Sequence, residues 1–275
     1  MKKTIFISSL LLASHCFANI NAIVSISPQK TFLSQIAKDK VTITTMVDKG
    51  ISVHTYEPKP SDMKKITKAD IYFSIGVEFE EHWLGKFTSL NKNMTISSTY
   101  KGIKKLTSTK HKNIKHKDEH LDPHIWTSPA NVKIIATNML NTLILRDSEN
   151  KEFYTKNYNE FIKKVENTNN KIKEILSKKD TKNFMVFHPS WQYFANEYKL
   201  NQIPIEIEGK NPKPKTIRKL ILEAKKNNIK AIFASPYKSN KMAKLISNEL
   251  NIKVIKISPM EDNWSKTMIK MAKSI

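Results

Sequence analysis

The chain has 275 residues, and its 47 Lys+Arg against 25 Asp+Glu give a formal net charge of +22. This length suits one large or two modest domains, and a hydrophobic content of 39% is enough for a packed core. The cations are nearly all lysines scattered along the chain, whereas nucleic-acid readers favour arginine for bidentate contacts. We therefore expect a solvated lysine-rich surface and no nucleic-acid partner.

Residues 1–18 have the organisation of a secretory signal peptide. Lys2 and Lys3 precede the apolar stretch TIFISSLLLA, which is too short to span a bilayer. Ala18 is the small residue that signal peptidase prefers, and Ala22 offers a second cleavage point. We expect export through a cleaved signal peptide.

Cys16 is the only cysteine and lies inside this segment. A lipid-attached protein would have a small residue directly before that cysteine, but His15 stands there, which argues against lipid attachment. After cleavage the chain would have no cysteine, so a metal site would depend on nitrogen and oxygen ligands.

Strand-like and helix-like segments alternate along the rest of the chain. Short β-branched or apolar runs predict strands over residues 22–26, 41–47, 71–75, 94–97, 184–187, 203–207, 231–234 and 254–257. Apolar residues three and four apart predict helices over 29–37, from Ser61, from Glu80, over 129–145, over 149–176 and over 263–272. Residues 101–120 are polar and lysine-rich without such periodicity, and we expect a mobile loop there.

The helix expected over residues 149–176 would be about 40 Å long at about 1.5 Å per residue, comparable to the width of a small domain. A spine between two lobes explains this length better than a layer of one compact domain does. Alternating strands and helices on both sides predict an α/β fold with parallel sheets covered on both faces. The expected division is an N-terminal lobe 19–147, a connecting helix 148–180 and a C-terminal lobe 181–275.

Three histidines stand where this architecture would bring them to a cleft. His54 follows the strand 41–47, His188 follows the strand 184–187, and His124 precedes a helix. Ligands of open α/β sheets bind beyond the carboxyl ends of the strands. Pro123 and Pro189 stiffen the backbone beside two of the histidines. From the residues alone, a three-histidine metal site and three hydrogen-bonded structural histidines are equally supported.

The segments around these histidines resemble the metal-binding subunits of bacterial ABC importers, the periplasmic solute-binding proteins for zinc or manganese. The chain has H-x-Y-E-P at 54–58, D-P-H-x-W at 122–126, and F-H at 187–188 followed by Y-F-A at 193–195. The resemblance runs along essentially the whole mature chain. It implies two (βα)4 lobes joined by a long rigid helix, with a metal held in the cleft between them. It also implies delivery of that metal to a membrane permease with a separate ATPase.

Residue by residue, His54, His124 and His188 match the three ligand positions of that family. Manganese-type members resemble one another in having Glu at the third position, whereas zinc-type members have His. Three imidazoles suit Zn(II) better than Mn(II), which prefers carboxylates, although Cu(II) and Ni(II) would bind them too. We therefore expect a monomer that captures Zn(II) in the periplasm. A protein for manganese, iron or another divalent metal of the same family is the alternative.

One position departs from the family pattern. Many members supply an aspartate as a fourth ligand after the last strand, and this chain has Ser258 there. A serine hydroxyl is a poor zinc ligand at neutral pH, so we expect a water in the fourth position. Glu57 and Asp262 are the other candidates for the fourth ligand. Binding should weaken below about pH 6, as imidazoles of pKa ~6.5 take up protons.

The loop before His124 contains further groups of the same kind, namely His111, His116, His120, Asp118 and Glu119. It resembles a short, diluted form of the histidine- and acid-rich loop of the zinc members. Two interpretations stay open: a weak auxiliary metal site, and a solvated tether without a specific role. His82, in EEHWL, is interpreted as a helix-surface residue.

Two rival classes of function are compatible with some of these features. Three histidines with a water also describe the catalytic site of a zinc-dependent hydrolase. Such an enzyme needs a general base beside the water, and neither H-E-x-x-H nor G-x-S-x-G occurs. An envelope adhesin would use the basic surface, and moderate salt would abolish its binding. We expect a binding protein without enzyme activity.

Overall fold

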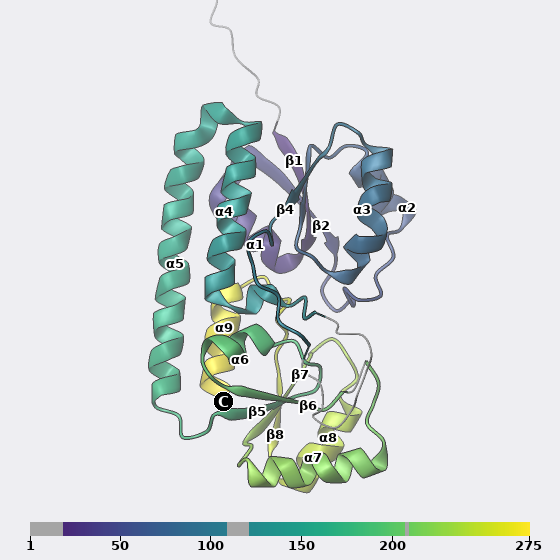
Figure 1. Cartoon of the computed structure of the whole chain (residues 1–275), viewed down its shortest axis with the longest axis vertical. Helices are drawn as coiled ribbons and strands as arrows, with labels where there is room; N and C mark the ends of the chain where they lie inside the picture. Colours follow the sequence, from purple (N-terminus) through teal and green to yellow (C-terminus); the bar gives the residue numbers. More distant parts are fainter. Residues whose placement is uncertain (1–18, 109–120, 207–208) are drawn as a thin grey trace, which may run out of the picture.

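The computed structural model describes residues 19–108, 121–206 and 209–275, which form two α/β lobes stacked end to end (Figure 1). Each lobe contains a four-stranded parallel sheet, with order β2-β1-β3-β4 in the first and β6-β5-β7-β8 in the second. The strands are β1 (Ile20–Ile26), β2 (Val41–Val47), β3 (Ile71–Ser74), β4 (Thr95–Ser98), β5 (Asn183–Val186), β6 (Asn201–Pro204), β7 (Ala231–Ala234) and β8 (Lys253–Lys256). This architecture confirms the predicted fold class.

Helices cover the sheets and join the lobes. They are α1 (Ser27–Ala37), α2 (Pro60–Ile66), α3 (Glu78–Leu90), α4 (Pro129–Arg146), α5 (Lys151–Ser177), α6 (Gln192–Glu197), α7 (Pro214–Lys226), α8 (Lys241–Leu250) and α9 (Trp264–Ser274). The central strands are buried on both faces, which explains why β3 and β7 read as unbroken apolar runs.

Most expected boundaries differ from the observed ones by one or two residues, and two of these differences bear on the argument. Ser61 does not cap α2, because the helix begins one residue earlier at Pro60, whose fixed φ suits the first helical position. β6 begins at Asn201, paired with Asn183, and ends at Pro204, although Ile205 and Glu206 still donate their backbone N–H groups to Val186 (2.8 Å) and Phe187 (2.9 Å). Ile207, the expected end of that strand, lies outside the described residues.

The connecting helix is present as predicted. α5 runs over 27 residues and contacts α1 and α4 beside the first sheet and α9 beside the second (Figure 1). Its buried side chains recur every three or four residues, so one apolar stripe of α5 packs against both lobes.

Two tryptophans tie the lobes together. Trp264, at the start of α9, packs edge-on against Phe32 of α1 with ring centroids 5.8 Å apart. The Nε1 of Trp264 donates to the carbonyl of Trp126 (2.7 Å), and the Nε1 of Trp126 donates to the carbonyl of Pro259 (3.0 Å). One hydrophobic core is therefore continuous from the first sheet through α5 to α9, and a smaller second core lies under α7 and α8.

Several sequence predictions concern segments outside the described residues. These are the signal peptide over 1–18 with Cys16, and the loop residues His111, His116, Asp118, Glu119 and His120. Within the described part, residues 101–108 form turns and irregular backbone, and Thr107 makes an isolated bridge with Leu121. No helix in the described part of the chain has both the length and the apolar character that a membrane span requires.

Candidate metal centre

The structure brings His54, His124 and His188 together between the lobes. One nitrogen of each imidazole lies within 4.8 Å of the corresponding nitrogens of the other two, and the Nε2 atoms of His54 and His188 are 3.3 Å apart. The three rings meet edge to face, with centroids 5.3 to 5.6 Å apart. Nitrogens at this spacing can bind one ion jointly.

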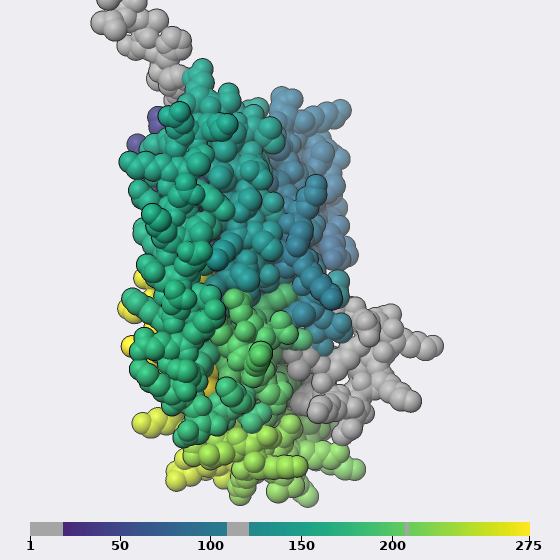
Figure 2. Space-filling view, turned by 60° about the vertical axis from the view of Figure 1, so that its left-hand side comes forward, coloured from purple at the N-terminus to yellow at the C-terminus, as the bar shows by residue number. Residues whose placement is uncertain are grey.

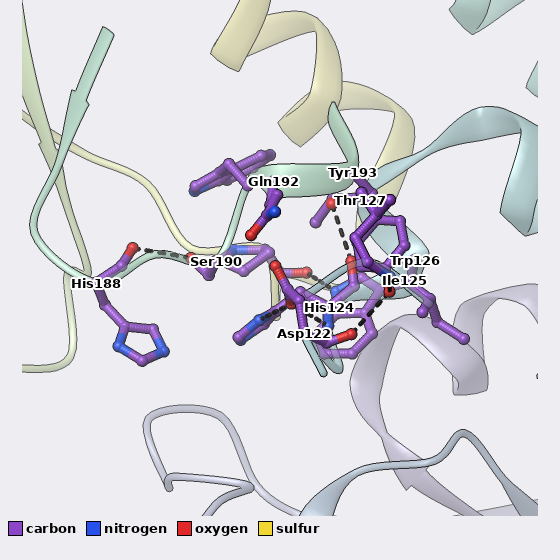
Figure 3. Close-up of polar contacts among 12 residues, drawn as sticks. Asp122, His124, Ile125, Trp126, Thr127, His188, Ser190, Gln192 and Tyr193 are labelled. Atoms are coloured by element: carbon purple, nitrogen blue, oxygen red, sulfur yellow. Dashed lines mark hydrogen bonds and ion pairs between the residues drawn. The ribbon is translucent and has the colours of Figure 1, made fainter. Parts of the chain in front are cut away.

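Each histidine reaches this point from a different element. His54 lies in the loop that follows β2, and His188 comes two residues after the end of β5, so both stand beyond carboxyl ends of parallel strands. His124 precedes the short 3-10 helix Ile125–Thr127, which leads into α4. Figure 3 shows His124 beside Asp122, with His188 on a separate segment of the chain.

The three histidines line a cavity of about 80 Å³ between the lobes. Its lining includes residues 50–53 of the first lobe and Ser190, Tyr237 and Ser258 of the second. This space is large enough for an ion with bound water.

A carboxylate holds the outer nitrogen of each imidazole. The Nδ1 atoms of His54 and His188 lie 2.7 Å from Glu78 Oε1 and Glu206 Oε2, respectively. The Nδ1 of His124 lies 2.8 Å from Asp122 Oδ1. A carboxylate partner keeps the proton on Nδ1 and leaves the lone pair of Nε2 free for a metal. All three imidazoles have a carboxylate partner that favours this arrangement.

The three pairs differ in burial. The side chains of His124 and Asp122 are 7% and 2% exposed, whereas His54 and Glu78 are 31% and 40% exposed. The same Asp122 oxygen also accepts the backbone N–H of His124 (2.8 Å), so this pair is fixed twice. The His124 half of the centre is consequently the most rigidly held.

Burial and neighbouring groups shift the pKa of one member of each of the other two pairs. Burial lowers the pKa of His188, although its hydrogen bond to Glu206 opposes that effect. Burial raises the pKa of Glu78, but the hydrogen bond and charge of His54 outweigh it, and the pKa stays below its ordinary value. Neutral imidazole is the form that binds metal.

Two of these carboxylates have a second oxygen that their histidine does not contact. Among the described residues, Glu78 Oε2 and Asp122 Oδ2 are buried without a hydrogen-bond partner. A buried unpaired carboxylate oxygen is costly unless positive charge lies nearby. A divalent cation bound by the three imidazoles would offset this charge, so the residues present fit a metal ion.

The candidates for the fourth position lie at different distances from the cavity. Ser258 is 5% exposed and lines the cavity, where its hydroxyl accepts the backbone N–H of Met260 (3.2 Å). Glu57 is exposed and is not among the lining residues. Asp262 forms an ion pair with Lys49 and also lies off the cavity wall. Of these three residues, the structure brings only Ser258 to the cavity.

Sequence reasoning missed Glu78 and Glu206 and gave Asp122 no role of its own. Glu206 follows β6 at the carboxyl edge of its sheet, the same edge that places His188, so the strand-end rule pointed to it. The expected strand 203–207 concealed this signal by placing Glu206 inside the strand. Glu78 begins α3, and nothing in its local sequence ties it to His54.

A model of the family described as "Zinc-uptake complex component A periplasmic" (ZnuA) matches residues 23–275. This chain belongs to the ZnuA family. It is 28% identical over 255 residues to the high-affinity zinc uptake system protein ZnuA of Bacillus subtilis, covering 88% of this chain and 79% of the relative. It is 27% identical to the manganese ABC transporter substrate-binding lipoprotein PsaA of Streptococcus anginosus, covering 80% and 73%.

Solved structures agree with the ZnuA assignment. A crystal structure of ZnuA superposes with a TM-score of 0.86 at 35% identity, covering 93% of this chain and 97% of that one. A Mn-bound periplasmic metal binding protein from candidatus liberibacter asiaticus gives a TM-score of 0.79 at 25% identity, covering 93% and 98%.

Membership of the ZnuA family decides the class of function. The relatives are metal-binding solute-binding proteins that work outside the cytoplasm with the permease and ATPase of an ABC importer, and they are not enzymes. The chain is therefore a solute-binding protein of the metal-importer type, and the hydrolase alternative is excluded.

His82 is exposed on α3, outside the histidine cluster.

Proposed function

We propose that the protein captures Zn(II) in the periplasm as the cargo of an ABC importer, with His54, His124 and His188 as its ligands. The observation that carries the proposal is the convergence of three imidazoles whose Nδ1 atoms are all held by carboxylates. Such a set presents three neutral nitrogen donors to one ion. A water would complete a four-coordinate zinc site, since Ser258 carries no charge.

The donor set supports zinc over manganese. Imidazole ligands suit zinc, whereas Mn(II) prefers carboxylate and water oxygens. Manganese import remains the second candidate, because relatives named for zinc and for manganese match the chain at similar identity. The carboxylates Glu78, Asp122 and Glu206 do not alter this preference, because the histidines separate them from the ion.

Hand-over to the permease would follow from small movements. The core that continues through Trp126, Trp264 and Phe32 opposes a wide opening of the two lobes about a hinge. The loop that holds His54 is the candidate to move, because the carboxylate partner of this histidine, Glu78, is 40% exposed, whereas Glu206 and Asp122 are 13% and 2% exposed. We propose that this loop moves when the loaded monomer docks on its permease. A large change in radius of gyration on zinc addition would contradict this mechanism.

We propose that the chain reaches the periplasm by export. Cleavage after Ala18 would leave β1 intact, whereas cleavage after Ala22 would remove Ile20–Ala22 from a central strand in which Ala22 is 2% exposed. We therefore propose residues 1–18 as the signal peptide. We also propose the division into an N-terminal lobe 19–147, a connecting helix 148–180 and a C-terminal lobe 181–275.

A competition titration of metal-free protein with Zn(II) and Mn(II), against a chelator of known affinity, tests the proposal. We expect one tight zinc site and far weaker manganese binding. His54→Ala should lower zinc affinity by more than about 100-fold. Loss of an outer-shell partner costs up to about 100-fold, and loss of a direct ligand should cost more. His82→Ala, a histidine exposed on α3, is the matched control and should change nothing. Tighter manganese than zinc binding would favour the second candidate.

A further inference from the structure

Helix α7 lies at the end of the molecule opposite the N-terminal lobe, as Figures 1 and 2 show. Its inner face is fixed by Leu220 and Ala224, both 1% exposed, which pack into the second core. The opposite face of α7 points to solvent, with Lys215 near its start. This outward face is remote from the metal centre and takes no part in it.

A leucine stands in the middle of this outward face. Leu222 is 67% exposed. On a helix, residues three and four positions away are neighbours on the same face. For Leu222 these four neighbours are Arg218, Lys219, Lys225 and Lys226, and all of them are exposed. One apolar side chain is thus surrounded by four cations.

Within the part of the chain that the structure describes, no acidic side chain pairs with these cations. Across the described ranges, no ion pair includes a residue of α7 or α8. Glu223 is the acid of α7 and lies beside the cationic face, about 100° round the helix from Leu222. The neighbouring helix α8, which contacts α7, adds the exposed Lys241 and Lys244. The positive potential of this end therefore faces the solvent.

An exposed leucine by itself needs no explanation, and the chain contains a contrasting example. Leu145, near the end of α4, is 87% exposed. The residues three and four positions before it are Thr142 and Asn141, and Leu145 has no comparable ring of cations. The arrangement around Leu222 is therefore a local property of α7.

We propose that the outward face of α7 binds the surface of an anionic phospholipid bilayer. The cations would contact the headgroups, and Leu222 would insert among them. Basic helices with an apolar side chain at the interface bind anionic membranes through charge and buried apolar area together. A soluble polyanion would use the cations but leave the leucine in water. Such contact would keep the protein beside the membrane that contains its permease, whichever metal it carries.

Co-sedimentation of the exported, purified chain with lipid vesicles tests this proposal. We expect binding to vesicles of phosphatidylcholine with phosphatidylglycerol, weak binding to phosphatidylcholine alone, and loss in high salt. Each cation removed should weaken binding about fivefold, so Lys219→Gln with Lys226→Gln should weaken it about 25-fold. Leu222→Ser should weaken it about fivefold.

Matched controls come from other helices of the chain. Leu145→Ser removes a more exposed leucine, and Lys163→Gln with Lys171→Gln removes two exposed lysines of α5. Neither should change vesicle binding. If the two α5 substitutions weakened vesicle binding as much as the two α7 substitutions, binding would depend on net charge and not on α7. If Leu222→Ser bound vesicles normally, the face would be a site for soluble polyanions, which heparin binding measured in parallel would identify. Either result, or no binding to anionic vesicles, would overturn the proposal.

Discussion

The two lobes hold their parts of the metal centre in different ways. In the first lobe, His124 and its partner Asp122 are two residues apart and almost fully buried. In the second lobe, His188 and Glu206 come from the ends of two neighbouring strands, and the histidine is 30% exposed. A local motif thus fixes His124, whereas strand register fixes His188. The His124 pair is rigid by construction, whereas the His188 pair depends on the packing of its sheet.

The hydrogen bonds that join the lobes involve the segment that holds His124; we call this set of contacts the joint. Trp126, two residues after His124, accepts a hydrogen bond from Trp264 and donates one to Pro259, which lies in the cavity wall. The C-terminal helix is therefore bound to the segment that holds His124. This arrangement couples the position of that ligand to the stability of the whole molecule.

The largest effect should follow from breaking this joint. Trp264→Ala removes a 3% exposed side chain and leaves the carbonyl of Trp126 without its donor. Replacing a buried Trp by Ala typically costs about 4 kcal/mol of unfolding free energy. Urea unfolding followed by circular dichroism measures this loss. Trp83→Ala, at a half-buried tryptophan of α3, should cost clearly less; an equal loss would mean that the joint has no special importance.

The second prediction compares the two carboxylate partners directly. Asp122→Asn should weaken zinc binding about 100-fold and Glu206→Gln about tenfold, within the range known for outer-shell partners. The reason is burial: Asp122 is 2% exposed and also holds the backbone of His124, whereas Glu206 is 13% exposed and contacts a half-buried histidine. Competition titration with a zinc chelator gives both affinities.

The control for this comparison is Asp262→Asn, which changes an exposed aspartate paired with Lys49 and should leave zinc affinity unchanged. If Glu206→Gln weakened binding as much as Asp122→Asn, the strand-end pair would be as rigidly held as the motif pair. The contrast between the lobes would then be wrong.

The fold was predictable from the sequence because its elements carry strong local signals. Alternating apolar runs and helical stripes marked the strands and helices, and the length of α5 pointed to two lobes. Errors arose where the local signal is weak, as at Ser61, which follows the proline that begins α2. The boundaries of short elements depend on such single residues.

The site was only half predictable for a related reason. The three histidines stand at strand ends or in a motif with proline, and these features suggested their convergence. Their partners Glu78 and Glu206 lie 24 and 18 residues from His54 and His188, so only the tertiary structure brings them together. Asp122 lies two residues from its histidine, and its spacing could have revealed it.

The lobes also differ in a buried carboxyl, which leads to the third prediction. Glu80 of the first lobe is 2% exposed, whereas no Asp or Glu of the second lobe is as buried in the described residues. Burial raises the pKa of Glu80 to about 7, although hydrogen bonds from Ser25 and the backbone of Ile75 and Gly76 oppose this. The folded protein thus binds a proton that the unfolded chain releases above about pH 4.5.

The stability that Glu80 contributes should be complete below about pH 4.5 and decline as the pH rises towards 7. Glu80→Gln keeps a neutral side chain, and its amide can donate to Ser25. We expect the wild type to lose on the order of 2 kcal/mol relative to this variant between pH 5 and pH 8. Urea unfolding of the metal-free proteins at both pH values measures the difference. Parallel curves for the two proteins would show that Glu80 does not titrate in this range.

The smallest effect should come from introducing a negative charge into the part of the cavity lining that the second lobe supplies. Ser258→Asp places a carboxylate in the cavity lining, where the Ser258 hydroxyl accepts the backbone N–H of Met260 in the described structure. A carboxylate would replace a water as the fourth ligand, so zinc affinity should rise about tenfold and manganese affinity more, since Mn(II) prefers oxygen donors. Ser258→Asn has the same shape without the charge and should give neither gain. Because residue 258 belongs to the same lobe as the His188 pair, the benefit of the added carboxylate depends on how well that lobe is held. A zinc affinity equal to that of the wild type would mean that the second lobe does not bring residue 258 within reach of the ion.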